Sequence, residues 1–207
     1  MHIEPITHQT CQEAAHVLGR AFADEPVSIA IYKGSDPDER IHNLTADFTI
    51  EVEDCIRRGI PLQISEAGKM VAAATIYPPG TYPFPWIYQA RLMFFAILDS
   101  RRVSVRASLR WQLAAGKIHP KEPHYYFQYL GVLPEYQGKG YGTAMMQYFT
   151  ALADQTKMPG YLETASAGAV PMYRRNGFET LVEKEIIGIR AWFMWRKPIN
   201  GTGELRR

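Results

Sequence analysis

A strand that runs into a glycine-rich loop and then into a helix is the feature that most constrains this chain. Residues 125–132 are aromatic and β-branched in character, which is typical of a strand. Residues 138–142 alternate glycine with other side chains, and residues 143–153 repeat apolar side chains at helical spacing. Glycines allow backbone amides to point one way, with the positive end of a helix behind them. The run predicts an anion site suited to a pyrophosphate, and Lys139 adds positive charge.

Two other phosphate-binding loops do not fit this run. A Walker A loop requires Ser or Thr after its lysine, whereas Gly140 follows Lys139. A dinucleotide-binding loop requires Gly-x-Gly-x-x-Gly near a first strand, whereas residues 138–142 read Gly-x-Gly-x-Gly deep in the chain. A glycine-rich turn without a ligand remains the alternative at this level.

The rest of the pattern predicts a single domain over residues 1–207. Strands are expected at 2–7, 60–65, 69–77, 125–132, 161–164, 178–187 and 191–197, and helices at 10–22, 36–58, 86–98, 100–115, 143–153 and 171–175. Residues 26–32 are ambiguous. Strands and helices alternate in the second half, which predicts an α/β fold whose mixed sheet has helices on both faces. Residues 78–124 form a helical, aromatic-rich insert before the central strand.

Two helix starts carry capping signals. Thr10 has Glu13 three residues later, which predicts a capping box. Asp36 is followed by Pro37 and by further acidic residues. This pattern predicts that Asp36 caps a helix and that the acids lie in its first turn, beside the positive helix pole.

Composition excludes several classes of protein. Hydrophobic residues make up 46% of the 207 and charged residues 21%, unlike a disordered or fibrous chain. Two cysteines cannot build a disulfide framework and favour a reducing compartment. The longest apolar stretch, 86–98, is shorter than the roughly 20 residues of a bilayer span, and no signal peptide is visible. We therefore expect a cytoplasmic protein without membrane association.

Charge and motif content exclude further classes of binding partner. The net charge of +2 is too mild to indicate nucleic acid. Residues 1–60 carry 11 acidic against 5 basic side chains, so the positive charge lies in the part that holds the glycine loop. The sequence contains no Cys-x-x-Cys, His-Glu-x-x-His or acidic calcium loop, and we expect no metal.

Two sequence blocks resemble a known family. Residues 137–142, read as Gln-x-x-Gly-x-Gly after a strand ending at 132–134, resemble the acyl-CoA-binding motif of the GNAT N-acetyltransferase superfamily. Residues 162–164 and then 170–178 are similar to the family's next strand, helix and Tyr-x-x-x-Gly-Phe signature. Weaker similarity at 21–27, 120–123 and 196–198 places the chain nearest the puromycin N-acetyltransferase-like branch.

The resemblance implies a GNAT-type fold that transfers an acetyl group directly from acetyl-CoA to an amine. The family's central strand bulges away from its neighbour, and Leu130, Gly131 and Val132 would offer this edge to the pantetheine. A backbone amide near Val132 would steady the thioester oxygen as it gains negative charge. The pyrophosphate would be held by Gln137, Gly138, Lys139, Gly140, Tyr141, Gly142 and Thr143.

The resemblance also implies roles for side chains near the cleft. Tyr173 matches the general acid that protonates the leaving thiolate. Glu163 is the first candidate for the base, with a structural ion pair as its alternative, and His124 is the second, although a solvated strand end is the favoured interpretation there. Where the family often has an asparagine that bonds the pantetheine, this chain has Ala169.

The acceptor side is expected to be aromatic. Of the 25 aromatic residues, 12 lie between Tyr77 and Tyr129, in a segment that includes the insert. Tyr82, Trp86 and Tyr129 are the candidate substrate contacts, which suits a primary amine of a small molecule, antibiotic-like or biogenic. A protein or peptide N-acetyltransferase and a non-catalytic acyl-CoA sensor remain the alternatives. The chain is expected to be a monomer or a homodimer.

Overall fold

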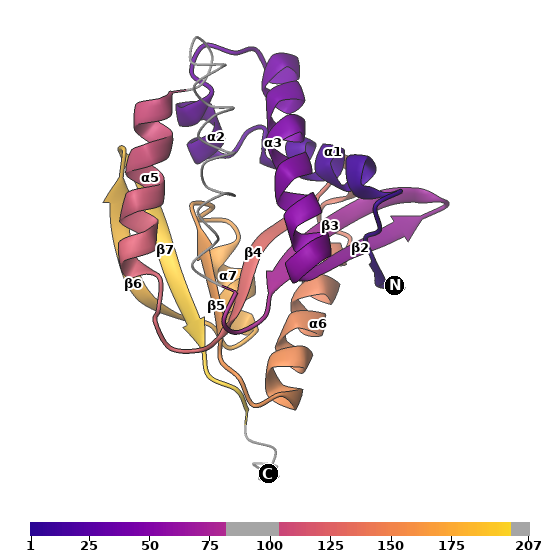
Figure 1. Ribbon diagram of the computed structural model, residues 1–207, viewed down its shortest axis with the longest axis vertical. Coiled ribbons are helices and arrows are strands. Elements are labelled where there is room, and N and C mark those ends of the chain that lie inside the picture. Colours follow the sequence, from indigo (N-terminus) through magenta and orange to yellow (C-terminus); the bar gives the residue numbers. More distant parts are fainter. Residues whose placement is uncertain (82–103, 200–207) are drawn as a thin grey trace.

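The computed structural model describes residues 1–81 and 104–199, which form a mixed sheet (Figure 1). The strands are β1 (Glu4–Pro5), β2 (Ile60–Glu66), β3 (Lys69–Tyr77), β4 (Tyr125–Val132), β5 (Gly160–Thr164), β6 (Glu179–Ile186) and β7 (Ile189–Arg196). Their order across the sheet is β1-β2-β3-β4-β5-β7-β6. Neighbouring strands are antiparallel except for the parallel pair β4 and β5. The predicted mixed sheet is confirmed.

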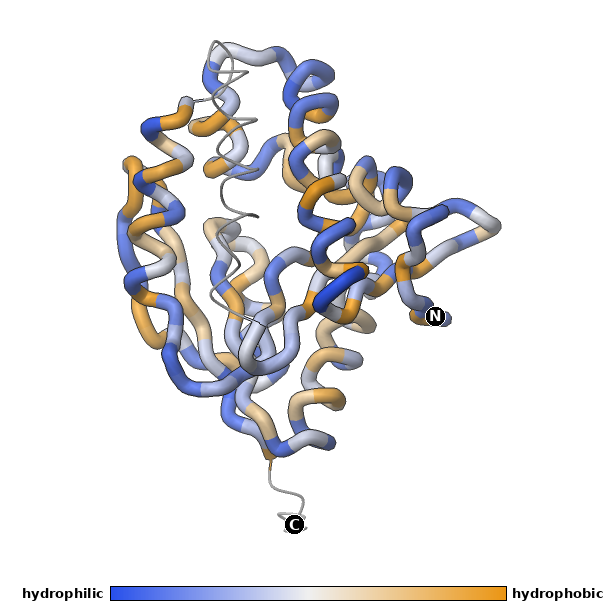
Figure 2. Tube along the Cα trace, in the orientation of Figure 1, coloured by the Kyte–Doolittle hydropathy of each residue, from blue (hydrophilic) through white to orange (hydrophobic). Residues whose placement is uncertain are grey.

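Helices cover both faces of this sheet. They are α1 (Cys11–Phe22), α2 (Pro26–Ile31), α3 (Pro37–Arg58), α5 (Val105–Ile118), α6 (Tyr141–Gln155) and α7 (Val170–Arg175). Ala72 and Ala74 pack in the apolar cluster that includes α6, whereas Ala73 packs with α1 and α3. Successive residues of a strand point to opposite faces, so α6 lies opposite α1 and α3. Figure 2 shows hydrophobic and hydrophilic residues alternating along these helices, as expected for elements that bury one side.

One predicted cap is confirmed and the other is wrong. Asp36 caps α3, because its Oδ1 accepts a hydrogen bond from the Glu39 amide at 2.8 Å. The Thr10 side chain makes no capping bond to α1. The Glu13 carboxylate accepts instead from the Met70 amide at 2.9 Å. A tertiary bond between α1 and β3 therefore replaces the local capping box.

Other boundaries shift by a few residues. The helix predicted at 100–115 is α5, which begins later because the Ser104 hydroxyl accepts from the Ala107 amide at 3.3 Å. The strand predicted at 2–7 is limited to β1. The helix predicted at 86–98 lies outside the described residues. In the described part of the chain, no helix combines the length and apolar character needed to cross a membrane.

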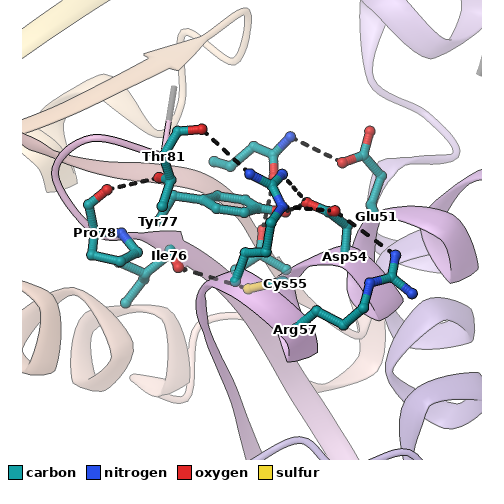
Figure 3. Close-up of polar contacts among 11 residues, drawn as sticks. Glu51, Asp54, Cys55, Arg57, Ile76, Tyr77, Pro78 and Thr81 are labelled. Carbon is teal, nitrogen blue, oxygen red and sulfur yellow. Dashed lines mark hydrogen bonds and ion pairs between the residues drawn. The ribbon is translucent and has the colours of Figure 1, made fainter. Parts of the chain in front are cut away.

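The C-terminal end of α3 is tied to the end of β3 (Figure 3). The Tyr77 hydroxyl donates to Asp54 Oδ2 at 2.9 Å. The Cys55 thiol contacts the Ile76 carbonyl oxygen at 3.7 Å, and burial raises the pKa of this thiol to about 12. The thiol therefore stays protonated and acts as a buried contact. These bonds fix the part of α3 that also carries Glu51, whose side chain lies one turn before Cys55.

A buried ion pair holds the end of β7. Arg196 is 4% exposed and donates to both Asp154 oxygens, each at 2.7 Å. Its Nε donates to the Asn176 carbonyl at 2.9 Å. Asp154 also accepts from the Ile199 amide at 2.7 Å. This bidentate pair joins the last strand to the end of α6 and to the turn after α7.

Candidate active site

The central strand β4 carries a bulge and separates from β5. Thr75 pairs with Tyr129 and Ile76 pairs with Phe127, so Gln128 is the extra residue on β4. β4 and β5 pair only at two positions near their start. Beyond these positions, the edge of β4 that faces β5 has no strand partner among the described residues. This edge includes Leu130, Gly131 and Val132, as the resemblance implied.

Gly131 has a structural reason to be glycine. A Cβ at this position would lie 2.9 Å from both Leu18 Cδ2 and Ala21 Cβ of α1. Real Cβ atoms do not approach other atoms so closely, so only glycine lets α1 pack against β4 here. The residue type therefore serves helix packing, while its backbone remains part of the edge that faces β5.

The glycine loop joins β4 to α6 through a short 3₁₀ turn at Pro134–Tyr136. Gly138 and Gly140 have φ of 77° and 90°, a region that favours glycine. A Cβ on Gly138 would meet no atom within 4 Å, so this face of the loop is open. The Gln137 side chain donates through Nε2 to the Val132 carbonyl at 3.2 Å and ties the loop to the strand.

The remaining loop residues divide into exposed and structural side chains. Lys139 and Thr143 are exposed, and Lys139 Nζ lies 4.5 Å from the centre of the Tyr136 ring. The Tyr141 hydroxyl donates to Glu66, and this bond is the main reason that the pKa of Tyr141 rises to about 12. The Tyr141 side chain thus fastens the start of α6 to β2, and only its backbone remains for an anion. Gly142 lies in the first turn of α6.

A cavity of about 410 Å³ lies beside the separated strands. It is lined from α1 to α3, from β4 and β5, and from α5 and α7. Glu163, Tyr173, Tyr129 and Leu130 all line it, so the structure brings these predicted residues together. Ala169 also lines it and places a methyl group where the family often has an amide.

Glu163 is held by two hydroxyl groups. Tyr126 donates to its Oε1 at 3.0 Å, and Tyr161 donates to its Oε2 at 3.1 Å. Burial raises the pKa of Glu163, while the two hydrogen bonds oppose that rise. The predicted alternative, an ion pair, is wrong for the described residues, because the recorded partners of this carboxylate are phenols.

Tyr173 lies near the carboxylate of Glu25, a residue outside the glycine-loop and Tyr-x-x-x-Gly-Phe motifs of the sequence. Burial raises the pKa of Tyr173 to about 12, the negative charge of Glu25 adds to this rise, and a hydrogen bond with Thr164 opposes it. Burial likewise raises the pKa of Glu25, which accepts a hydrogen bond from Ser166. Glu25 precedes Pro26 at the start of α2, and nothing in that local pattern predicts that it lies near Tyr173, which is far along the sequence on α7.

His124 is not the solvated strand end that the sequence favours, because it is 7% exposed. Its Nε2 lies 3.1 Å from Nε2 of His119, and its Nδ1 lies 2.6 Å from the Glu122 carbonyl oxygen. Burial lowers the pKa of both imidazoles, to about 3 for His119. The two rings pack against Tyr161, behind Glu163, and neither lines the cavity.

One wall of the cavity holds three packed aromatic rings. The Tyr129 ring centre lies 5.0 Å from that of Phe48 and 5.8 Å from that of Phe22, edge to face in both cases. Phe22 and Phe48 lie at apolar positions of helical spacing in the sequence, a pattern that by itself indicates core residues. The Tyr129 hydroxyl donates to Glu51 at 3.4 Å. The other two predicted substrate contacts, Tyr82 and Trp86, lie outside the described residues.

We expect Gly140→Ala to weaken CoA binding at least tenfold, because an alanine at φ of 90° strains the loop by about 1–2 kcal/mol and turns its amides. Isothermal titration with CoA measures this. Gly188→Ala is the matched control, since Gly188 has φ of 79° in the β6–β7 turn. Equal CoA affinity for Gly140→Ala and wild type would contradict the loop's role.

Comparisons with known proteins agree with this geometry. Residues 90–180 match the family model described as Acetyltransferase (GNAT) domain. An uncharacterised N-acetyltransferase of Schizosaccharomyces pombe is 25% identical over 175 residues, which cover 81% of this chain and 70% of that protein.

Solved structures agree with the fold. The Corynebacterium glutamicum protein described as histone acetyltransferase HPA2 and related acetyltransferase has a TM-score of 0.73 and 24% identity, covering 97% of this chain and 98% of its own. Arylalkylamine N-acetyltransferase 2 of Aedes aegypti has a TM-score of 0.60 and 15% identity, covering 95% and 98%. None of these matches specifically supports the puromycin N-acetyltransferase-like branch.

Proposed function

Because residues 90–180 match the GNAT acetyltransferase domain and the described fold agrees with it, we propose that the chain transfers the acetyl group of acetyl-CoA to a primary amine of a small molecule in the cytoplasm. The observation that carries this proposal is the cavity in which the free edge of β4 meets Tyr173 and two carboxylates. The cavity is of the size and largely apolar character that small ligands require.

The donor side fits acetyl-CoA in two respects. The unpaired edge of β4 at residues 130–132 offers backbone groups to the amides of a pantetheine chain, as an added strand would. The open loop at 137–143, with α6 behind it, offers amides and the positive helix pole to the pyrophosphate. In this proposal, a backbone amide near Val132 stabilises the thioester oxygen as charge develops on it.

Tyr173 is the proposed general acid. Its phenol donates a proton to the sulfur as the carbon–sulfur bond breaks. A pKa near 12 keeps this proton in place at neutral pH, and Thr164 orients the hydroxyl through their hydrogen bond. The proton that the acceptor amine loses is taken first by the base and is then returned to the Tyr173 phenolate, which becomes the phenol again, so the enzyme ends the cycle in its starting state.

Glu163 is the proposed general base. The attacking nitrogen must lose a proton, and a carboxylate with a raised pKa accepts it more readily than an exposed one does. Glu25 is the other carboxylate near the reaction. Its charge raises the pKa of Tyr173, so we assign it the support of the acid rather than the removal of the proton.

Thiol release from acetyl-CoA across a panel of amines and peptides tests the function. We expect turnover with at least one small primary amine. Peptides as the better acceptors would favour the protein or peptide N-acetyltransferase, and tight CoA binding without thiol release would favour a sensor.

A pair of variants tests the assignment of the base. We expect Glu163→Gln to lower kcat by about 100-fold or more and to remove the acid-side inflection that Glu163 gives to the pH profile of kcat. We expect that inflection in the wild type because Glu163 becomes protonated as the pH drops through its raised pKa. Glu25→Gln is the matched variant, with an expected loss of about tenfold. A reversed order would assign the base to Glu25.

A further inference from the structure

Among the described residues that line the cavity, the charged side chains are acidic. Four carboxylates line it, and none of the described lining residues is Lys, Arg or His. The four are Glu25, Asp47, Glu51 and Glu163. The cavity therefore offers groups that attract an ammonium ion and repel an anion.

Two of these carboxylates flank the place where the amine must react. Glu163 is bonded by the Tyr126 and Tyr161 hydroxyls, and Glu25 by the Ser166 hydroxyl. Hydroxyl groups are neutral, so they orient these carboxylates without cancelling their charge. Burial strengthens the interaction of such a charge with any second charge placed beside it.

One wall of the cavity has a different character. Phe22, Phe48 and Tyr129 all line it, with ring centres 5.0–5.8 Å apart. Tyr129 meets both phenylalanine rings edge to face, and the two phenylalanine rings are tilted at 52° to each other. Such a group offers a ligand ring an apolar surface and ring edges at the spacing that aromatic pairs prefer. The cavity thus joins an aromatic wall to an acidic reaction centre.

From this arrangement we propose that the acceptor is an aromatic primary amine without a carboxylate next to its amino group. The inference rests on the proposed function and names its substrate class. The aromatic wall holds the ring, and the amine lies between Glu25 and Glu163. An aromatic amino acid has the same ring and amine, but its carboxylate would enter the same acidic, buried space. Like charges there oppose binding and the approach to the thioester.

Three probes that differ in one substituent test the role of charge. They are phenethylamine, phenylalaninamide and phenylalanine, each measured by thiol release from acetyl-CoA. We expect kcat/KM for phenylalanine to be at least 100-fold below that for phenethylamine, and phenylalaninamide to be within about tenfold of phenethylamine. The amide has the size of the acid without its charge. Equal use of phenylalanine, or equal rejection of acid and amide, would overturn the inference.

A conservative variant tests the aromatic wall. Phe22→Leu removes a ring from a partly exposed position while keeping apolar volume. We expect it to raise KM for phenethylamine at least fivefold and to leave KM for hexylamine within twofold. Equal changes for both amines would contradict a ring-binding wall. If hexylamine reacts and phenethylamine does not, this inference fails and the proposed function stands; if no amine or peptide reacts, the proposed function fails.

Discussion

Replacing Tyr173 by phenylalanine should lower kcat by about 100-fold or more while CoA affinity stays within about twofold. The ring keeps its packing against Phe178, where the ring centres lie 6.3 Å apart, so only the proton donor is lost. The leaving thiolate must then take its proton from water. Steady-state thiol release gives kcat, and titration with CoA gives the affinity.

Tyr148→Phe is the control for this change, since Tyr148 is 39% exposed on α6. It should retain wild-type turnover. The pH profile adds a second check. A pKa near 12 means that Tyr173 keeps its proton up to strongly alkaline pH, so its ionisation should not limit the wild-type rate at pH 9 or 10. Unchanged turnover in Tyr173→Phe would remove Tyr173 from the mechanism.

Removing the buried cation Arg196 should cost about 1.5–3 kcal/mol of the free energy of unfolding, because charge-assisted hydrogen bonds to a partly exposed carboxylate are lost. Arg196→Met preserves much of the volume but leaves Asp154 without the guanidinium that holds both of its oxygens. It also leaves the Asn176 carbonyl without its donor. Urea unfolding followed by circular dichroism measures the loss.

Arg190→Met is the matched control on the same strand. Arg190 is 68% exposed and contacts Glu183 at 3.3 Å, and an exposed ion pair contributes about 1 kcal/mol or less. Arg196 holds the pKa of Asp154 below its ordinary value. The pair therefore contributes its full stability at pH values above that ordinary pKa, and this contribution is lost as the pH falls through the lowered pKa. The deficit of Arg196→Met should therefore shrink in acid. Equal losses for both variants would contradict the importance of the buried pair.

Local patterns predicted the elements well, because their signals lie within a few residues. The Asp36 cap and the loop before α6 are of this kind. Their order along the chain also predicted a mixed sheet, since alternating strands and helices have few ways to pack. The Thr10 capping box failed because the Glu13 side chain reaches β3, and only the folded chain brings those two elements together.

The candidate site depends even more on contacts between distant segments, which local sequence patterns do not predict. Glu163 and Tyr173 lie in segments that resemble a family motif, so the sequence could name them. Glu25 and Phe22 come from the first helices and reach the cavity only through tertiary packing. The burial of His124 is not predictable from its local sequence, because its partner is another imidazole across a short loop and an aromatic ring of another strand packs against it.

The bulge on β4 affects both sides of the sheet at once. Tyr125 and Phe127 pack toward α6, and strict alternation would send Tyr129 the same way. Gln128 is the extra residue, so Tyr129 packs with α1 and α3 instead, while Leu130 packs toward α6. One inserted residue thus accompanies the unpaired edge of β4 and also turns an aromatic ring into the cavity. Under the proposed function, a deletion in this strand would disturb the sites of both substrates together.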